Sequence, residues 1–385
     1  MKKKSIVLVA YNSESSISYS GIEYYIKCAF NEANYKVISL NIKNYINIPS
    51  KLFLIFLSKP VRIYYRLIKK VEISYSFYGS LIYRMILTLF FFFNKKTLKK
   101  SDLIFMFTAP YGLSKSVQNP IIVYSDGSIK WLIKWQRKRD LVSFEENLHK
   151  KNYKAMKRAD LIIALFNEVK KEADEYFKDA TKTIYFGTGL NLPKLSYSQS
   201  KLLNNKFNNQ LIIFIGRKHY LDGAHKLLEA NKIIKKNKRI VNYKIYIIGL
   251  KKELLTPLDE NVTIIEFINK NDVNDIKFYS DLLASATLFV NPSSIGGAYM
   301  ATLEALYYHT PVVLTQYPEI NSFFNDKEKP GLLIRPDLSP LLLADEIENI
   351  MGNAQIWLKY SNAASKISNE LGWDKLISHI ENRFN

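Results

Sequence analysis

The sequence predicts an α/β protein with two Rossmann-like domains in tandem, and three observations support this fold class. Short, apolar, β-branched runs alternate with helical segments along the whole chain, a pattern typical of doubly wound parallel sheets. The chain has 385 residues, more than twice the roughly 150 residues of an average domain. Hydrophobic residues make up 48% of it, which is enough for two cores and excludes a disordered chain.

The N-terminal domain, residues 1–192, begins with a βαβ unit. The run Ser5–Ala10 predicts a buried parallel strand that ends in a polar loop. Ser20 and Gly21 then open a helix whose apolar residues lie three or four positions apart. Further strands are expected at Tyr35–Leu40, Asp102–Thr108, Ile121–Tyr124, Asp160–Leu165 and Thr183–Phe186, with a charged helix at Asn167–Phe177.

Residues 193–209 are polar and lack apolar periodicity, so we interpret them as an interdomain linker. The C-terminal domain, residues 210–370, repeats the alternation of strands and helices. A last helix within residues 371–385 is left over and can return to the N-terminal domain. Strands are expected at Leu211–Ile215, Lys244–Ile248, Val262–Phe267, Leu288–Asn291 and Pro311–Thr315. Helices are expected at Gly223–Lys235, Ile276–Ala284, Met300–Tyr308, Leu341–Met351 and Trp373–Phe384.

The formal charge of +20 is distributed unevenly. Residues 1–200 carry 33 Lys and Arg against 15 Asp and Glu, whereas residues 201–385 carry 22 against 20. The excess in the first half indicates a polyanionic partner, either nucleic acid or an anionic membrane surface. An AT-rich genome is the alternative explanation for the lysine count, but it does not explain the asymmetry.

The segment from residue 59 to 100 has ten basic residues and one acid. Its apolar run Met85–Phe93 is far shorter than the roughly 20 residues of a bilayer-spanning helix. We expect this segment to dock on the membrane, with lysines at positions 69, 70, 95, 96, 99 and 100 contacting anionic lipid. The alternative is a buried core helix. Both interpretations hold if Phe90–Phe93 lies in the core of the N-terminal domain and the lysines lie on its surface.

Residue types also exclude several classes of protein. A single cysteine, Cys28, rules out a disulfide framework and indicates a reducing compartment. The first residues do not resemble a signal peptide, so a cytoplasmic location is expected. The five histidines show no metal-ligand spacing and no Asp-x-Asp pair occurs. We therefore expect neither a metal site nor a cofactor.

Two motifs of the C-terminal domain indicate a phosphate-binding site. In the first, a strand ends at Asn291, and Gly296, Gly297, Ala298 and Tyr299 lead into a helix that contains Glu304. Backbone N–H groups there suit a diphosphate, and the carboxylate of Glu304 suits a ribose diol. In the second motif, Gly216, Arg217 and Lys218 follow a strand, where an arginine clamps phosphate oxygens. A plain strand–helix turn and a surface arginine are the alternatives.

Together these residues resemble the GT-B glycosyltransferases, of the glycosyltransferase family 4 type found in bacterial surface-polysaccharide synthesis. The resemblance covers nearly the whole chain and rests on four pieces: Ser20-Gly21, Phe186–Asn191, Phe214–Arg217 and Asn291–Val313. It implies that Arg217 holds the donor diphosphate, that Glu304 holds the nucleotide ribose, and that Ser20 and Gly21 lie near the donor phosphates and the acceptor.

The resemblance also implies an activity. It predicts a metal-independent, retaining hexosyltransferase with a donor and acceptor cleft between the two domains. The donor would be a nucleotide diphosphate sugar, and the acceptor a glycan or lipid-linked glycan. The basic first half would hold the enzyme peripherally on the inner face of the cell membrane, and no nucleic acid is expected as a partner.

Three positions depart from the family pattern. Asp222 stands where the family has a lysine, and Gly296 stands where it has a first glutamate. Ser125 takes the place of the usual histidine of the N-terminal domain. Lys218 or the backbone amides would then compensate at the diphosphate.

Asp126 follows the strand that ends at Tyr124, so it is a candidate for acceptor binding or general-base catalysis. An Asx turn before Gly127 is the alternative interpretation. Two other functions remain open from the sequence: a nucleotide-sugar epimerase of the same fold, and a nucleic-acid-binding protein.

Overall fold

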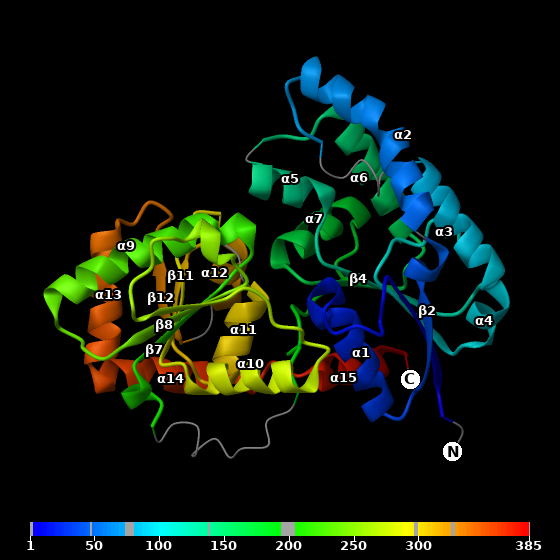
Figure 1. Ribbon diagram of the computed structural model, residues 1–385. Coiled ribbons are helices and arrows are strands. Elements are labelled where there is room, and N and C mark those ends of the chain that lie inside the picture. Colours follow the sequence, from blue (N-terminus) through cyan, green and yellow to red (C-terminus); the bar gives the residue numbers. More distant parts are fainter. Residues whose placement is uncertain are drawn as a thin grey trace. The chain divides into compact units, whose positions relative to one another are not determined.

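The computed structural model describes residues 3–46, 48–73, 81–137, 139–193, 205–295, 299–324 and 328–384. The chain divides into two compact units, of which unit 1 comprises Met1–Thr188 with Asp374–Asn385 and unit 2 comprises Gly189–Trp373. Each unit contains one six-stranded sheet with helices around it, as Figure 1 shows. The prediction of two Rossmann-like domains is confirmed.

The sheet of unit 1 is parallel throughout, with the strand order β2-β1-β3-β4-β5-β6. Its strands are β1 (Ser5–Ala10), β2 (Lys36–Asn41), β3 (Leu103–Met106), β4 (Ile121–Ser125), β5 (Leu161–Ala164) and β6 (Thr183–Tyr185). Its helices are α1 (Ile22–Glu32), α2 (Ile48–Leu67), α3 (Leu81–Phe93), α4 (Lys95–Lys100), α5 (Ile129–Arg137), α6 (Ser143–Met156), α7 (Asn167–Phe177) and α15 (Trp373–Phe384). Helices cover both faces of the central strands, so these strands are apolar without interruption.

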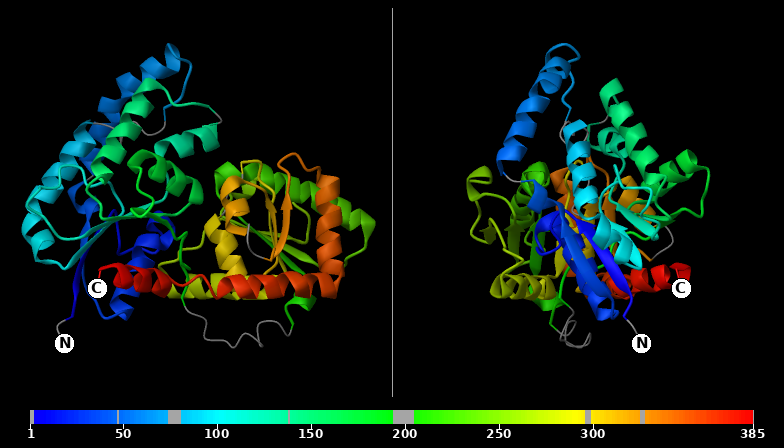
Figure 2. Two further views of the ribbon diagram at one scale, coloured as in Figure 1. Left: turned by 180° about the vertical axis from the view of Figure 1, so that it is seen from behind. Right: turned by 90° about the vertical axis from the view of Figure 1, so that its right-hand side faces the viewer.

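The basic, apolar segment of unit 1 forms α2, α3 and α4. Figures 1 and 2 show α2 standing out from the rest of unit 1. Helix α3 buries Phe90 and Phe91 in the core, but Phe92 and Phe93 are each 68% exposed. The four phenylalanines therefore divide between the core and the surface. In the described part of the chain, no helix has the length and apolar character needed to cross a bilayer.

Helix α15 belongs to unit 1, although it follows unit 2 in the sequence. The hydroxyl of Tyr35 donates a hydrogen bond to Glu381 at 3.2 Å, and Arg383 donates to the carbonyl of Thr181 at 2.8 Å. Leu376 and Ile380 are buried. The last helix thus completes the first unit.

The sheet of unit 2 is also parallel, with the order β12-β11-β10-β7-β8-β9. Its strands are β7 (Leu211–Ile215), β8 (Lys244–Ile248), β9 (Val262–Ile265), β10 (Leu288–Asn291), β11 (Val312–Thr315) and β12 (Gly331–Ile334). Its helices are α9 (Leu221–Asn237), α10 (Val273–Ser285), α11 (Tyr299–Tyr307), α12 (Pro318–Phe324), α13 (Pro340–Gly352) and α14 (Ala354–Ser368). The core of unit 2 joins β7, β8 and β10 to α9, α13 and Trp357 of α14.

Unit 2 contains one strand and two α-helices that the sequence did not indicate, namely β12, α12 and α14. It also includes Lys206, which the sequence placed in the linker. This side chain is fully buried, and its ammonium group donates to the carbonyls of Leu283 and Tyr308 and to the Thr310 hydroxyl. Burial lowers the pKa of Lys206 well below its usual value. Most of the predicted linker lies outside the described residues.

Candidate functional site

The candidate donor site lies at the carboxyl edge of the unit 2 sheet, where the loops after β7, β8 and β10 meet. The backbone N–H of Gly216 donates to the Ile248 carbonyl at 2.9 Å. Gly249 has a φ of +95°, and a Cβ placed there would lie 2.6 Å from the Gly216 carbonyl oxygen. Only glycine allows this approach without strain. Ligands of open α/β sheets bind at this edge.

Arg217 and Lys218 follow Gly216 and are exposed. Arg217 has an extended backbone that begins the short 3₁₀ helix Lys218–Tyr220. In the described part of the chain, no carboxylate lies within ion-pair distance of its guanidinium. Burial, with a smaller contribution from the charge of Arg217, lowers the pKa of His219. The arginine is thus available to an anionic ligand.

Asp222 ties the start of α9 to the loop after β10. Its carboxylate accepts a hydrogen bond from the Ser294 backbone N–H at 2.7 Å. A Cβ at the adjacent Gly223 would lie 2.3 Å from the Ser293 hydroxyl oxygen, so the two segments touch at this glycine. Asp222 therefore has a definite structural contact at the position where the family has a lysine.

The loop after β10 is fixed at its start. Asn291 donates through Nδ2 to the Ile215 carbonyl at 3.0 Å and accepts from the Ser293 hydroxyl at 2.6 Å. Gly296, Gly297 and Ala298 lie outside the described residues. Tyr299 begins α11 and is buried, with its ring 5.8 Å from that of Phe323.

Glu304 lies on α11 and is only 2% exposed. Its Oε1 accepts from Lys270 Nζ at 2.6 Å, and its Oε2 accepts from the Tyr279 hydroxyl at 2.5 Å. Lys270 Nζ also lies 4.4 Å from the centre of the Tyr279 ring. Burial, together with the Glu304 carboxylate, raises the pKa of Tyr279 well above its usual value. The three residues form a compact charged cluster, which we call the Glu304 cluster.

The sequence did not indicate Lys270 or Tyr279 as site residues. Lys270 precedes α10, and Tyr279 lies in the second turn of that helix. Both look like ordinary residues of a polar loop and an amphipathic helix. Their hydrogen bonds to Glu304 join α10 and the loop before it to α11, and no local pattern reveals such contacts.

In unit 1, the loop after β1 is held by Glu23 of α1. Its buried carboxylate accepts from the backbone N–H groups of Tyr11 and Asn12 at 2.7 and 2.8 Å. Ser20 and Gly21 precede α1 with left-handed φ angles of +55° and +84°. A Cβ at Gly21 would lie 2.9 Å from the Ser16 carbonyl oxygen, so this turn requires glycine. Glu23 is a third residue that the sequence did not single out, after Lys270 and Tyr279.

Asp126 is exposed and comes directly after β4, at the carboxyl edge of the unit 1 sheet. Ser125, the last residue of β4, is buried. The next helix, α5, is capped by Ser128, whose hydroxyl accepts from the Trp131 N–H and donates to Glu172 at 2.7 Å. The position of Asp126 thus agrees with the expectation that it ends a strand. Among the described residues, no three acidic, His or Cys side chains gather as they would around a metal ion.

Two parallel six-stranded sheets, each with helices around it, form the GT-B fold that this chain shares with solved glycosyltransferases. Residues 209–353 match the family model described as "Glycosyl transferases group 1". The matched range contains Gly216, Arg217 and Glu304. Unit 2 therefore contains a glycosyl transferase group 1 domain, and the fold of the whole chain agrees with a glycosyltransferase.

Solved structures share the fold over the whole chain. A glycosyltransferase from Rickettsia africae is 16% identical with a TM-score of 0.64, and the match covers 100% of this chain and 98% of that one. A sucrose-phosphate synthase from Thermosynechococcus elongatus is 15% identical with a TM-score of 0.62, covering 99% and 98%. The Anabaena protein HepE, in complex with UDP and glucose, is 14% identical with a TM-score of 0.59, covering 98% and 99%. No curated protein sequence matches the chain.

Proposed function

We propose that this protein transfers a hexose from a nucleotide diphosphate sugar to a glycan or lipid-linked glycan in cell-surface polysaccharide synthesis. Unit 2 would bind the donor and unit 1 the acceptor. The observation that carries the proposal is the match of residues 209–353 to group 1 glycosyl transferases, because this range contains the loops that form the candidate donor site. The complex of HepE with UDP and glucose supports a nucleotide sugar as the donor.

The donor diphosphate would lie against Gly216, Arg217 and Lys218. As the sugar leaves, negative charge develops on the departing diphosphate, and fixed dipoles and cations stabilise that charge. The exposed guanidinium of Arg217 supplies a bidentate donor and Lys218 a second cation. In this proposal no metal ion is needed, and the sugar is transferred with retention of configuration.

The ribose of the donor would be held by Glu304. Each carboxylate oxygen already accepts one hydrogen bond, from Lys270 or from Tyr279. A carboxylate has about four lone-pair positions, so ribose hydroxyls can add to these two bonds. Lys270 and Tyr279 then have a positioning role, because they fix the carboxylate before the nucleotide binds.

The acceptor side of the proposal includes membrane association on the inner face of the cell membrane. Met85, Leu89, Phe92 and Phe93 of α3 are each more than half exposed, and Lys96, Lys99 and Lys100 follow on the same segment. An apolar stripe beside lysines is the pattern of a helix that lies in a lipid interface. Asp126 would contact the acceptor or act as a general base.

Glu304→Gln tests the donor site. The variant keeps the shape of the side chain but removes the charge that strengthens its hydrogen bonds, and each such bond contributes about 1.5–3 kcal/mol. We expect the affinity for the preferred nucleoside diphosphate to fall at least about tenfold. The ligand is first identified by thermal shift with UDP, GDP, dTDP and CMP, and its dissociation constant is then measured by calorimetry.

Glu348→Gln is the matched control, because Glu348 is also buried in unit 2 and accepts from Asn237 at 2.8 Å. It should leave nucleotide affinity unchanged. An unchanged affinity in Glu304→Gln would remove the ribose assignment. Conversion of a nucleotide sugar to its epimer, with no nucleoside diphosphate released, would contradict the proposed transfer.

A further inference from the structure

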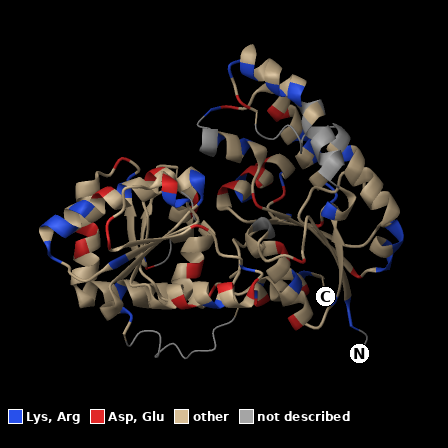
Figure 3. Ribbon diagram, in the orientation of Figure 1, with Lys and Arg blue, Asp and Glu red and all other residues tan. Residues whose placement is uncertain are grey.

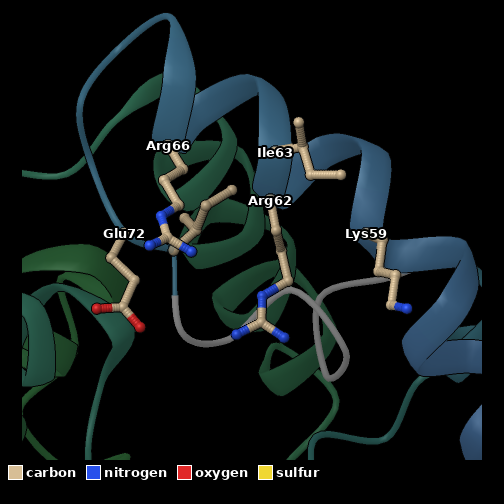
Figure 4. A pocket seen from close by; sticks show the side chains of 6 residues that line it. Lys59, Arg62, Ile63, Arg66 and Glu72 are labelled. Atoms are coloured by element: carbon tan, nitrogen blue, oxygen red, sulfur yellow. The ribbon is translucent and has the colours of Figure 1, made fainter.

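Helix α2 lines a hollow of about 320 Å³ in unit 1, shown in Figure 4. This volume lies at the lower end of the range for small-molecule sites, roughly 300–1,000 Å³. Its lining residues are Lys59, Arg62, Ile63, Arg66, Glu72 and Ile73. The three basic side chains leave α2 on the same side, and Arg66 is the one that lies beside Glu72. All six belong to unit 1, and the family match does not include them.

The charge of this hollow is unbalanced. Three cations face one carboxylate, which leaves a net charge of +2. Among the described residues, neither Arg62 nor Arg66 has a carboxylate within ion-pair distance. The sequence of α2 contains no acid at all, and Figure 3 shows Lys and Arg recurring along it. The hollow therefore attracts an anion.

The spacing of the cations indicates which anion. Residues 59, 62 and 66 lie three and four positions apart, so they follow one face of the helix. Arg62 and Arg66 are separated by about one helical turn of 5.4 Å. Each guanidinium can hold one phosphoryl group through two parallel hydrogen bonds. A diphosphate diester carries one negative charge on each phosphoryl group, which matches the net charge of the hollow.

A second stripe on α2 is apolar. It consists of Phe56, Ile63 and Leu67, which are 64%, 52% and 69% exposed. These positions are seven and then four residues apart along the helix. At 100° per residue this stripe lies beside the basic one. Tyr65, on the side of α2 opposite this stripe, packs on α6 through the ring of Phe144 at 6.3 Å and accepts from the Phe144 N–H. The side that faces away from the unit is thus the apolar one.

We propose that the α2 hollow binds the diphosphate group of a lipid-linked acceptor, while the apolar stripe of α2 enters the lipid. The inference deepens the proposed function and rests on it, because it assigns the lipid-linked form of the acceptor to a particular site. Arg62 and Arg66 bind the two phosphoryl groups. Lys59 adds a third cation at one end of the hollow.

The test compares two kinds of vesicle of equal surface charge at ~0.15 M salt. One contains phosphatidylcholine with a polyprenyl diphosphate that carries one sugar, and is thus a diphosphate diester, and the other contains phosphatidylcholine with phosphatidylglycerol. We expect the full-length protein to bind the diphosphate vesicles more tightly. The double variant Arg62→Gln/Arg66→Gln should weaken this preference about tenfold, because two bidentate contacts, four hydrogen bonds in all, are removed. The variant Arg62→Lys/Arg66→Lys should retain only part of the preference for the diphosphate vesicles. Lysine keeps the positive charge but cannot form the two parallel hydrogen bonds of a guanidinium.

Two further measurements make the test specific. Lys115→Gln/Lys154→Gln removes the same number of charges from exposed positions elsewhere in unit 1 and should keep the preference for the diphosphate lipid. UDP affinity should be unchanged in every variant, because the candidate donor site is in unit 2. Equal binding of both vesicles by the wild-type protein, or an unchanged preference in the Arg62→Gln/Arg66→Gln variant, would overturn the inference.

Competition with inorganic pyrophosphate distinguishes a site for a lipid headgroup from a site for any free diphosphate. We expect pyrophosphate to compete only weakly with the diphosphate vesicles, because it cannot use the apolar stripe. Competition as strong as that of the lipid would overturn the lipid assignment. If the wild-type protein binds diphosphate vesicles but no nucleoside diphosphate, the proposed transferase function fails while the α2 site stands.

Discussion

His309 lies two residues after the end of helix α11 and has a left-handed conformation, with a φ of +58°. Its ring is almost fully buried, and among the described residues its Nδ1 has no hydrogen-bond partner. Burial, with a contribution from nearby Lys206, lowers the pKa of His309 to about 4. The buried imidazole is therefore neutral in the folded protein at neutral pH. The folded state disfavours its protonated form.

The free energy of unfolding should therefore decrease as the pH falls from about 6.5 toward 4. The unfolded chain binds the proton with an ordinary pKa of about 6.5, so protonation favours unfolding. At pH 5 the expected loss from His309 is about 2 kcal/mol relative to pH 8. His309→Asn should reduce this pH dependence, because asparagine has no titratable group and tolerates the left-handed region.

Urea unfolding of unit 2 at several pH values measures this effect. Gln316→Asn is the control, since Gln316 is an exposed residue of unit 2 and this change adds or removes no titratable group. His149, whose pKa burial also lowers to about 4, is retained in both variants. Equal slopes in the wild-type protein and His309→Asn would show that His309 does not titrate in this range.

Arg217 offers a second test at the scale of one residue. Arg217→Gln should weaken a nucleoside diphosphate at least about tenfold and leave the corresponding nucleoside nearly unaffected, because only the phosphate contact is removed. Isothermal calorimetry with both ligands makes the comparison. Arg335→Gln, an exposed arginine of the same unit, should change neither affinity. Equal weakening of both ligands would indicate a structural role for Arg217.

Helices α3 and α4 combine two functions in one stretch of sequence. The inner side of α3 contributes Leu87, Phe90 and Phe91 to the core of unit 1. The outer side exposes Phe92 and Phe93 next to the lysines of α4. The two interpretations of this segment are a buried core helix and a membrane-docking helix. Each interpretation describes one side of α3.

Replacing the lysines at positions 95, 96, 99 and 100 with glutamine should release the protein from phosphatidylglycerol vesicles. Each lysine near an anionic surface contributes about 1 kcal/mol. Thermal stability should change little, because these side chains lie at the surface. Vesicle co-sedimentation should also show wild-type binding fading as salt rises from ~0.1 to ~1 M.

The matched control removes the same number of charges from unit 2, at the exposed lysines 232, 236, 251 and 252. It should leave vesicle binding unchanged. The membrane proposal fails if both sets of changes have the same effect on vesicle binding, or if vesicle binding does not depend on salt concentration. The excess of positive charge would then reflect only the overall amino-acid composition.

At the scale of the whole molecule, unit 1 is completed by residues that follow unit 2. Leu376, Ile377 and Ile380 of α15 are buried, and Arg383 bonds to the carbonyl of Thr181. Leu376→Ala with Ile380→Ala should destabilise unit 1 by about 4–8 kcal/mol, because each large-to-small change in a core costs about 2–4 kcal/mol. Nucleotide binding to unit 2 should persist.

Calorimetry combined with limited proteolysis identifies which unit unfolds first. Exposed His379 of the same helix provides the control His379→Ala, which should leave both units unaffected. Loss of unit 2 before unit 1 in the double variant would show that α15 does not contribute to the stability of unit 1.

Much of the fold could be predicted from the sequence because buried parallel strands are continuous apolar runs. Ser5–Ala10 and Leu211–Ile215 have the predicted bounds. Strand β12 was missed because Gly331–Ile334 is only four residues long and begins with a glycine directly after a proline. Helix α14 was missed because its apolar residues are interspersed with small and polar ones.

The sequence by itself determined the alternation of strands and helices, the uneven charge, and the glycines and Arg217 of the candidate donor site. These are local properties, fixed by periodicity and by the backbone freedom of glycine. Only the tertiary structure decided that Lys270 and Tyr279 hold Glu304, that Asp222 contacts Ser294, and which phenylalanines of α3 reach the surface. The physical reason is that these contacts join residues from different elements, and the packing of those elements depends on the whole core rather than on any one segment.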